Sequence, residues 1–201
     1  MRYVKIFGLL AVAAAALMAF AASASATTVT GPSLNTNNEP TSLVERETPT
    51  IHAVSEEEVE LHNSILNIKC ESTVEGKVET HGTGITAEGK IAVLNFFNCT
   101  DNWVIDVKQN GSLIVHWTKG SDGTLTSTGA RVIATRFGLE CIYETNATHI
   151  GTVTGEKGVN GEATLDIEAA IPRVGGSFLC GGGTAAWTGS YITTHTLKID
   201  P

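Results

Sequence analysis

The chain has 201 residues, of which 21 are acidic and 13 basic, so its formal net charge is −8 at pH 7. An acidic chain without clusters of lysine and arginine is not expected to bind nucleic acid or an anionic membrane surface, because both would repel it. The chain also contains 21 glycines and four cysteines. Thr, Val and Ile are abundant, which is typical of β-strands joined by tight turns.

The first 26 residues have the features of a secretory signal peptide. Arg2 and Lys5 form a short positive region, and an apolar, alanine-rich run follows at 6–20. The sequence Ala24-Ser25-Ala26 then fits the small-residue cleavage pattern. Because the run is short for a membrane span, we predict a secreted or cell-surface bacterial protein with no integral membrane segment after cleavage. The mature chain would keep 11 basic and 21 acidic residues, a net charge of −10.

Residues 27–50 are predicted to form an extended polar arm ahead of a single β domain at 51–201. The arm contains Pro32, Pro40 and Pro49, and its start suits a short strand. A mature chain of about 175 residues can fold as one domain that buries roughly 70% of the surface of its unfolded state.

The stretch 99–117 carries the clearest local pattern. Asn110-Gly111 separates two β-rich runs, and this dipeptide favours a tight hairpin because both central residues of a type I′ turn need positive φ. Apolar residues alternate on both sides of the turn, which predicts that each strand has a buried face. These residues are Trp103, Ile105 and Val107 before the turn, and Leu113, Val115 and Trp117 after it.

The rest of the chain predicts more strands and no helix. Turn residues punctuate it at short intervals, and no mature segment combines a helical period with caps. Short strands at regular spacing favour an all-β fold, either an antiparallel β-sandwich or, as the alternative, a β-barrel. The predicted strands lie at 59–69, 73–80, 90–97, 124–127, 131–137, 139–145, 149–155, 162–171 and 187–199.

Two motifs are interpreted as turns rather than as sites. Residues 82–87 match the dinucleotide fingerprint G-x-G-x-x-A, but a strand pattern follows where the fingerprint needs a helix. The acidic run at 56–58 is predicted to be a solvated turn, because a calcium site needs more converging oxygens than one run supplies.

The four cysteines are Cys70, Cys99, Cys141 and Cys180. An even number behind a secretory signal predicts two disulfides, with three pairings open. A weak internal repeat favours Cys70–Cys99 with Cys141–Cys180, because one member of each pair opens a half of the domain and the other ends a loop. Trp103 follows soon after Cys99, and Trp187 follows soon after Cys180. Both tryptophans are therefore predicted to be core residues beside disulfides. No C-x-x-C pair suggests zinc.

Catalytic patterns are missing, and no catalytic, metal-binding or cofactor-binding residue is predicted. No serine is flanked by the two glycines of a nucleophile elbow. The histidines occur singly, and the carboxylates are glycosidase candidates by residue type alone. The histidines are His52, His62, His81, His116, His149 and His195, and the carboxylates are Asp101, Asp106, Glu140, Asp166 and Glu168.

From residue 68 onward the chain resembles small secreted four-cysteine β-proteins of actinobacterial type. The likeness rests on cysteine-bearing strands, on Asn98-Cys99 after a β run, and on the ending AWTGSYIT at 186–193. A more remote similarity is to secreted matrix proteins named as activators of alkane oxidation. The resemblance implies an exported β architecture and carries no site residues.

We therefore expect a non-enzymatic secreted or cell-envelope structural or binding module. One alternative is a carbohydrate or apolar-ligand binder that uses Trp117 and Tyr191 as exposed aromatic contacts. Another is a self-assembling extracellular matrix subunit, in which the arm at 27–50 adds as a strand to a neighbouring copy. An unrecognised hydrolase is the remaining alternative. Expected partners are an envelope polymer or further copies of the chain.

Overall fold

The computed structural model describes residues 27–31, 49–81, 86–156 and 161–200. The predicted signal peptide, most of the polar arm and most of the G-x-G-x-x-A motif lie outside them. No helix in these ranges is long and apolar enough to cross a membrane.

The elements are β1 (Thr28–Thr30), β2 (Thr50–Ser55), β3 (Val59–His62), β4 (Asn67–His81), β5 (Thr86–Phe97), η1 (Thr100–Asn102), β6 (Val104–Gln109), β7 (Ser112–Lys119), β8 (Asp122–Thr128), β9 (Arg131–Arg136), β10 (Leu139–Glu144), β11 (Thr148–Thr154), β12 (Glu162–Gly176), η2 (Phe178–Cys180), β13 (Thr184–Thr196) and β14 (Lys198–Asp200).

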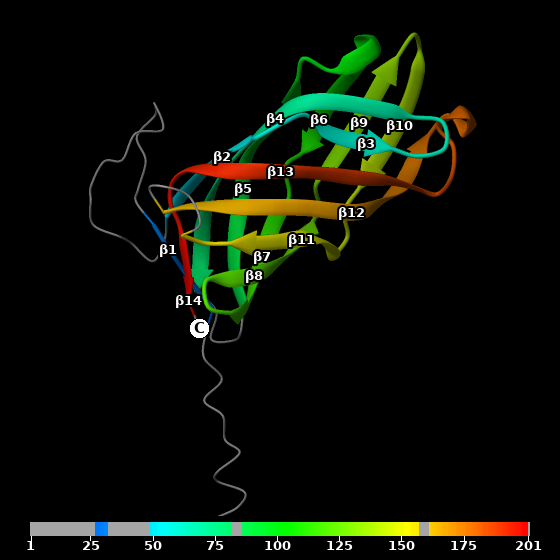
Figure 1. Cartoon of the computed structure of the whole chain (residues 1–201). Helices are drawn as coiled ribbons and strands as arrows, with labels where there is room; N and C mark the ends of the chain where they lie inside the picture. Colours follow the sequence, from blue (N-terminus) through cyan, green and yellow to red (C-terminus); the bar gives the residue numbers. More distant parts are fainter. Residues whose placement is uncertain (1–26, 32–48, 82–85, 157–160, 201) are drawn as a thin grey trace, which may run out of the picture.

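The strands form an antiparallel barrel of eight passes of the chain (Figure 1). Four passes consist of one strand each, β4, β5, β12 and β13, and four consist of two consecutive strands, β2 with β3, β6 with β7, β8 with β9, and β10 with β11. Each pass pairs with the next, and β13 closes the ring on β2 and β3. The predicted all-β, antiparallel, disulfide-linked class is confirmed, in the form of the barrel alternative. Closure pairs the sheet edges that a sandwich leaves open, whereas the period-two pattern is the same in both folds.

The predicted tight hairpin at Asn110-Gly111 is wrong. β6 and β7 do not pair with each other, because β6 pairs with β9 while β7 pairs with β5 and β8. Only Gly111 of the two has positive φ, at 74°. The Asn110 side chain donates to the Ala92 carbonyl, 2.6 Å away, and the Gly111 carbonyl accepts from Ile91 N at 3.2 Å. The dipeptide therefore makes a step within one continuous pass of the barrel wall.

One end of the barrel, called the base here, is closed by the two ends of the described chain. β1 pairs antiparallel with β14, and Val29 and Ile199 are fully buried between barrel strands. The Thr27 hydroxyl accepts a hydrogen bond from Trp117 N at 3.1 Å. The short strand predicted at the start of the arm is confirmed, and it belongs to the barrel of its own chain.

Both disulfides lie at the opposite end, called the disulfide end. Cys70 of β4 is bonded to Cys99, and Cys141 of β10 is bonded to Cys180 of η2, so the predicted pairing is confirmed. Each bridge joins a strand to the segment that follows a neighbouring strand: β4 to the segment after β5, and β10 to the segment after β12. The alternation predicted in β12 is confirmed too, since Ala163, Leu165, Ile167, Ala169 and Ile171 are buried along one face.

Candidate functional site

Three apolar cavities follow one another inside the barrel. The cavity at the disulfide end has a volume of about 50 Å³, the middle cavity about 30 Å³ and the base cavity about 50 Å³. Neighbouring cavities share wall residues: Leu94, Ala130 and Trp187 line both of the first two, and Val74, Ile91, Leu113, Leu125 and Leu165 line both of the last two. The interior therefore contains adjoining small voids that share wall residues.

The wall beside the cavity at the disulfide end lacks one ladder. β5 pairs with β7 only over Thr86–Lys90, and among the described strands its distal part forms no ladder with β6, which lies next to it. This stretch of wall without a ladder, called the slit here, runs from the Asn110–Ala92 hydrogen bond to the 98–103 connection. Leu94, Phe96 and Ile105 line the cavity from its two sides. Side chains rather than backbone hydrogen bonds thus close the barrel there.

Two interior hydroxyl chains are fully hydrogen-bonded. Tyr191 donates to Ser72 Oγ at 3.0 Å, and Ser72 donates to the Asn95 carbonyl at 2.9 Å. Burial raises the pKa of the Tyr191 hydroxyl far above its ordinary value, against the smaller opposing effects of the Ser72 hydrogen bond and of the nearby Trp187. Ser127 and Thr145 share a second hydrogen bond at 2.9 Å. These groups brace the wall without leaving a free donor.

Trp187 is different, because its indole nitrogen is buried and has no hydrogen-bond partner. Its ring packs edge-to-face on Phe96, with ring centroids 6.2 Å apart. The Tyr191 hydroxyl lies close enough for Trp187 to lower the Tyr191 pKa slightly, yet no hydrogen bond of normal geometry joins them. Trp187 therefore presents an unpaired donor to the wall shared by two cavities.

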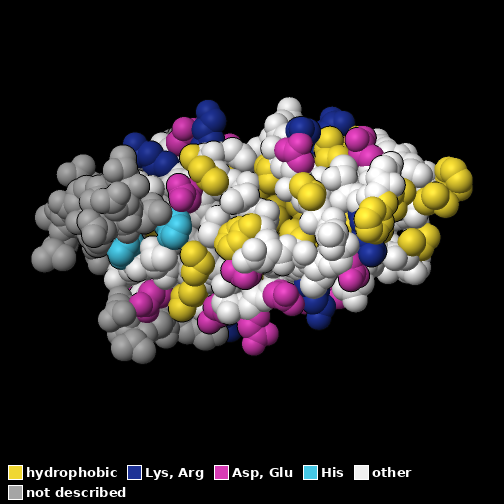
Figure 2. Space-filling model, turned by 90° about the horizontal axis from the view of Figure 1, so that it is seen from above, with side chains coloured by type: hydrophobic (Ala, Val, Ile, Leu, Met, Phe, Trp, Pro, Cys, Tyr) yellow, Lys and Arg dark blue, Asp and Glu magenta, His cyan; other side chains and the backbone are white. Residues whose placement is uncertain are grey.

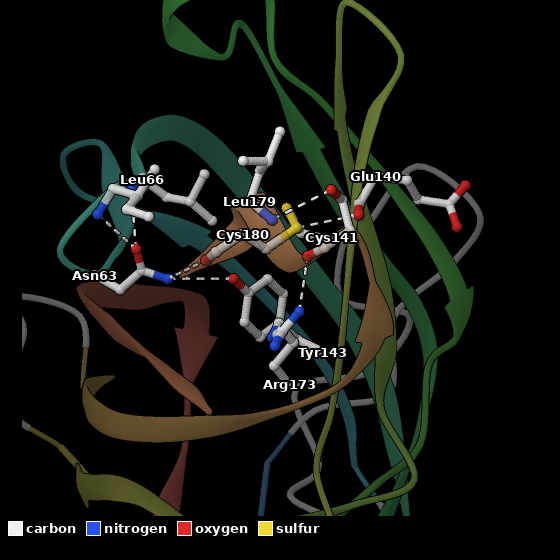
Figure 3. Close-up of a disulfide and its surroundings, with 10 residues drawn as sticks. Asn63, Leu66, Glu140, Cys141, Tyr143, Arg173, Leu179 and Cys180 are labelled. Carbon is white, nitrogen blue, oxygen red and sulfur yellow. Dashed lines mark hydrogen bonds between the residues drawn. A yellow bond between two sulfur atoms is a disulfide. The ribbon is translucent and has the colours of Figure 1, made fainter. Parts of the chain in front are cut away.

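Asn63 fixes the disulfide end by joining the β3–β4 turn to η2 (Figure 3). Its Oδ1 accepts from Ile65 N and Leu66 N, both at 2.9 Å, while Nδ2 donates to the Cys180 carbonyl at 2.9 Å and lies 3.5 Å from the Tyr143 hydroxyl. Burial raises the pKa of Tyr143, and the nearby Arg173 opposes that effect. A single side chain thus ties a turn, a disulfide and a cavity-lining tyrosine together.

Exposed apolar side chains gather at the disulfide end. Figure 2 shows hydrophobic side chains at the end of the molecule opposite the grey residues. Phe97 and Val104 stand at the mouth of the slit, where β5 ends and β6 begins. The other members of this group lie on two turns, at the end of β12 and on η2; they are Ile65, Phe137, Val174, Phe178 and Leu179.

The two aromatic residues predicted as exposed ligand contacts do not form such a surface. Tyr191 is only 2% exposed and points into the barrel, so its predicted exposure is wrong. The residue faces inward because its strand alternates with the same period as its buried neighbours. Trp117 is half-buried near the base, and its indole nitrogen donates to the Gly120 carbonyl at 2.8 Å in its own turn. Of the two tryptophans predicted as core residues, Trp103 is buried and Trp187 is half-buried.

The candidate carboxylates lie on the outside of the barrel. Asp106 pairs with Lys108, and the Ser190 hydroxyl lies within hydrogen-bond distance of both Asp166 and Glu56, at 3.0 and 2.8 Å. Asp101, Glu140 and Glu168 are exposed, as are Glu56–Glu58 in their predicted turn. None of these residues lines the three interior cavities.

The histidines whose side chains the structure describes are not grouped as metal ligands. His52 and His195 come near each other in a small hollow of about 10 Å³ by the base, where His52 also contacts Glu75. No group of three or more metal-ligating side chains comes together in the part of the chain that the structure describes.

No family model, curated protein or solved structure matches the chain. Sequence patterning missed Phe96, Ile105 and Trp187 as a group, because each is an ordinary apolar position of a strand. The closed barrel brings these residues of β5, β6 and β13 to one cavity.

Proposed function

We propose that this chain is a secreted, non-catalytic binding module that holds a small apolar molecule inside its barrel. The row of apolar cavities beside a slit in the wall is the observation that carries the proposal. Barrels of eight strands have interiors that are either filled by side chains or just wide enough for one small ligand. In this barrel the side chains leave three successive cavities along the interior.

The interior favours a neutral ligand. Protein cores normally contain few voids larger than a water molecule, and apolar surface transferred from water contributes roughly 25 cal/mol per Å². The two cavities nearest the disulfide end are lined by apolar residues and by Ser127, Tyr143, Thr145 and Tyr191. Among the described residues, no carboxylate, lysine, arginine or histidine lines them. An ionised ligand would lose its hydration there and gain no partner of opposite charge.

The slit and the exposed apolar turns support a route inward. Phe96 and Ile105 close the slit by packing, and rotation of side chains breaks fewer interactions than opening a ladder. Phe97 and Val104 place apolar surface at its mouth, where an apolar molecule would first make contact. The outward position of the carboxylates supports a binding role over hydrolysis.

The two disulfides are compatible with an oxidising compartment, which supports export. The arm gives less support to self-assembly, because β1 is already paired with β14 of the same chain. A binding module therefore accounts for more of the described structure than a matrix subunit does.

The test is a titration with 4-heptanone and n-heptane followed by methyl NMR. We expect saturable shifts in the methyl resonances of Leu94, Leu125 and Ile167, which line the middle cavity. Ala130→Leu should weaken binding at least tenfold, because Ala130 lies in the wall shared by two cavities. Ala170→Leu is the matched control, since Ala170 is exposed on β12.

Absence of saturable shifts with either compound would overturn the proposal. Shifts restricted to exposed methyl groups, or equal affinity in Ala130→Leu and Ala170→Leu, would do the same. The wild-type methyl map decides the matter even if Ala130→Leu does not fold.

A further inference from the structure

We propose that the ligand carries one uncharged hydrogen-bond acceptor within its apolar body, and that this atom accepts the indole N–H of Trp187. This inference rests on the proposed binding function and adds the chemical class of the ligand. It assigns Trp187 as the residue that distinguishes a ketone, ether or ester from a hydrocarbon of the same size.

The unpaired donor is the first reason. The Trp187 indole nitrogen is buried without a hydrogen-bond partner, and buried polar groups in folded proteins are nearly always paired because leaving one unpaired is unfavourable. The other buried side-chain nitrogens without a partner belong to His62, Arg136 and Arg173, none of which lines the three cavities. Trp187 is therefore the unpaired donor of the described cavity walls.

The neighbouring hydroxyls do not satisfy this donor. Tyr191 gives its proton to Ser72, and Ser72 gives its proton to the Asn95 carbonyl. The Tyr191 oxygen keeps acceptor lone pairs, but no hydrogen bond of normal geometry joins it to the indole nitrogen. Thr145 and Ser127 are bonded to each other, and Thr145 Oγ1 also accepts from Ala130 N at 3.0 Å. The edge-to-face contact with Phe96 restricts rotation of the Trp187 ring toward another acceptor.

The position of Trp187 places the acceptor along the ligand. The residue lines both the cavity at the disulfide end and the middle cavity, so an acceptor bonded to it has apolar space on both sides. A carbonyl or ether oxygen with short alkyl groups on each side fits this arrangement. A carboxylate does not, because the lining offers neutral donors and no cation to replace the lost hydration.

The test compares 4-heptanone with n-heptane, which differ only by the central oxygen. Dissociation constants are measured for the wild type, for Trp187→Phe and for Trp117→Phe. Trp117 is the matched control, because its indole is bonded to Gly120 and lines none of the three cavities. We expect Trp187→Phe to weaken 4-heptanone binding roughly 3- to 10-fold more than it changes n-heptane binding, the range of one neutral hydrogen bond. Trp117→Phe should change both equally.

A second measurement follows the indole N–H resonances of the wild-type protein. The indole N–H resonance of Trp187 should move downfield on saturation with 4-heptanone and should move less with n-heptane. Spectra of Trp117→Phe and Trp103→Phe identify this resonance among the three tryptophans, which keeps the test decisive if Trp187→Phe does not fold.

The two levels of the proposal fail in different ways. If both compounds bind inside the barrel, but the variants respond equally and the Trp187 resonance does not distinguish the compounds, the acceptor inference is wrong and the binding function stands. If neither compound binds, the proposed function itself is wrong.

Discussion

The two halves of the barrel are closed by different means. In the base half each pass is joined to both neighbours by backbone ladders, from β2–β4 around to β13–β2. In the disulfide half, β6, β9 and β10 continue the passes, but the ladder between β5 and β6 is missing. Both disulfides lie in this second half.

The difference shows how a barrel can keep an opening and remain folded. Hydrogen bonding around the ring holds the base, and β1 with β14 covers it. In the other half, covalent links and the Asn63 contacts hold the turns where the ladder is absent. The slit therefore lies in the half whose stability depends least on continuous strand pairing.

The largest expected effect follows from removing the bridge between β10 and η2. We expect Cys141→Ala with Cys180→Ala to lower the free energy of unfolding by about 3–4 kcal/mol, because the two residues are 39 positions apart and the bridge restricts the unfolded chain. Urea denaturation measures the loss. Hydrogen exchange should show faster opening of β9 and β10 than of β7, β8 and β11, and equal acceleration in both halves would contradict the comparison.

Gly111→Ala tests the junction between the halves. An added Cβ would lie 2.5 Å from both Thr128 O and Ala130 N, and the residue has a φ of 74°. Backbone atoms cannot rotate away, so we expect a loss of about 2–4 kcal/mol in thermal or urea unfolding. Gly120→Ala is the matched control. It has a φ of 55° but nothing within 4 Å, and should lose only about 1 kcal/mol. Similar losses in both would contradict the importance of the close approach.

Asn63→Ala tests the lock at the disulfide end. The change removes the acceptor for Ile65 N and Leu66 N and the donor to the Cys180 carbonyl. We expect a loss of about 1–3 kcal/mol, measured by urea denaturation, since these partners are left without their bonds. Asn67→Ala, at an exposed position of the same region, should change stability by no more than about 0.5 kcal/mol.

The smallest effect is a pH dependence from the two buried tyrosines. Burial raises the pKa of both Tyr191 and Tyr143 above the ordinary value of 10.0, so the neutral hydroxyl is favoured in the folded state. The stability that the two neutral hydroxyls give the folded state is fully present below pH 10. It is lost as the pH rises above 10, because the tyrosines of the unfolded chain then release their protons first. Each tyrosine lowers the free energy of unfolding by at most about 1.4 kcal/mol per pH unit in that range.

Tyr191→Phe and Tyr143→Phe separate the two contributions. Urea denaturation between pH 9 and 11 should show a shallower decline in each variant than in the wild type. The difference should be larger for Tyr191→Phe, since its hydroxyl is more strongly affected by burial. A decline as steep as that of the wild type in Tyr191→Phe would contradict the assigned burial effect.

Local patterning predicted much of this fold. The alternation in β12 and the cysteine repeat depend on residues that are near each other in sequence or in equivalent halves, and both predictions are confirmed. The choice between sandwich and barrel depends on whether the last pass pairs with the first, and period-two patterning is identical in the two cases. Asn110-Gly111 does not form the predicted hairpin because β6 pairs with β9, and β7 pairs with β5 and β8.

The candidate site was beyond local patterning for the same reason. Tyr191 and Trp187 lie four positions apart in β13, and both could be read as apolar or aromatic positions of a strand. The Tyr191 hydroxyl donates to Ser72, whereas the Trp187 indole nitrogen has no partner, and the sequence does not distinguish these two cases. A missing partner becomes visible only when the whole wall is assembled.

The pairing of Thr28 with Asp200 has a practical consequence for experiments. Any polypeptide joined to either end of the described chain leaves from the base, so a tether attached there orients the slit and the apolar turns away from a solid support. Immobilisation through these ends is therefore suited to ligand capture, whereas coupling through lysines scattered over the wall would orient the molecules at random.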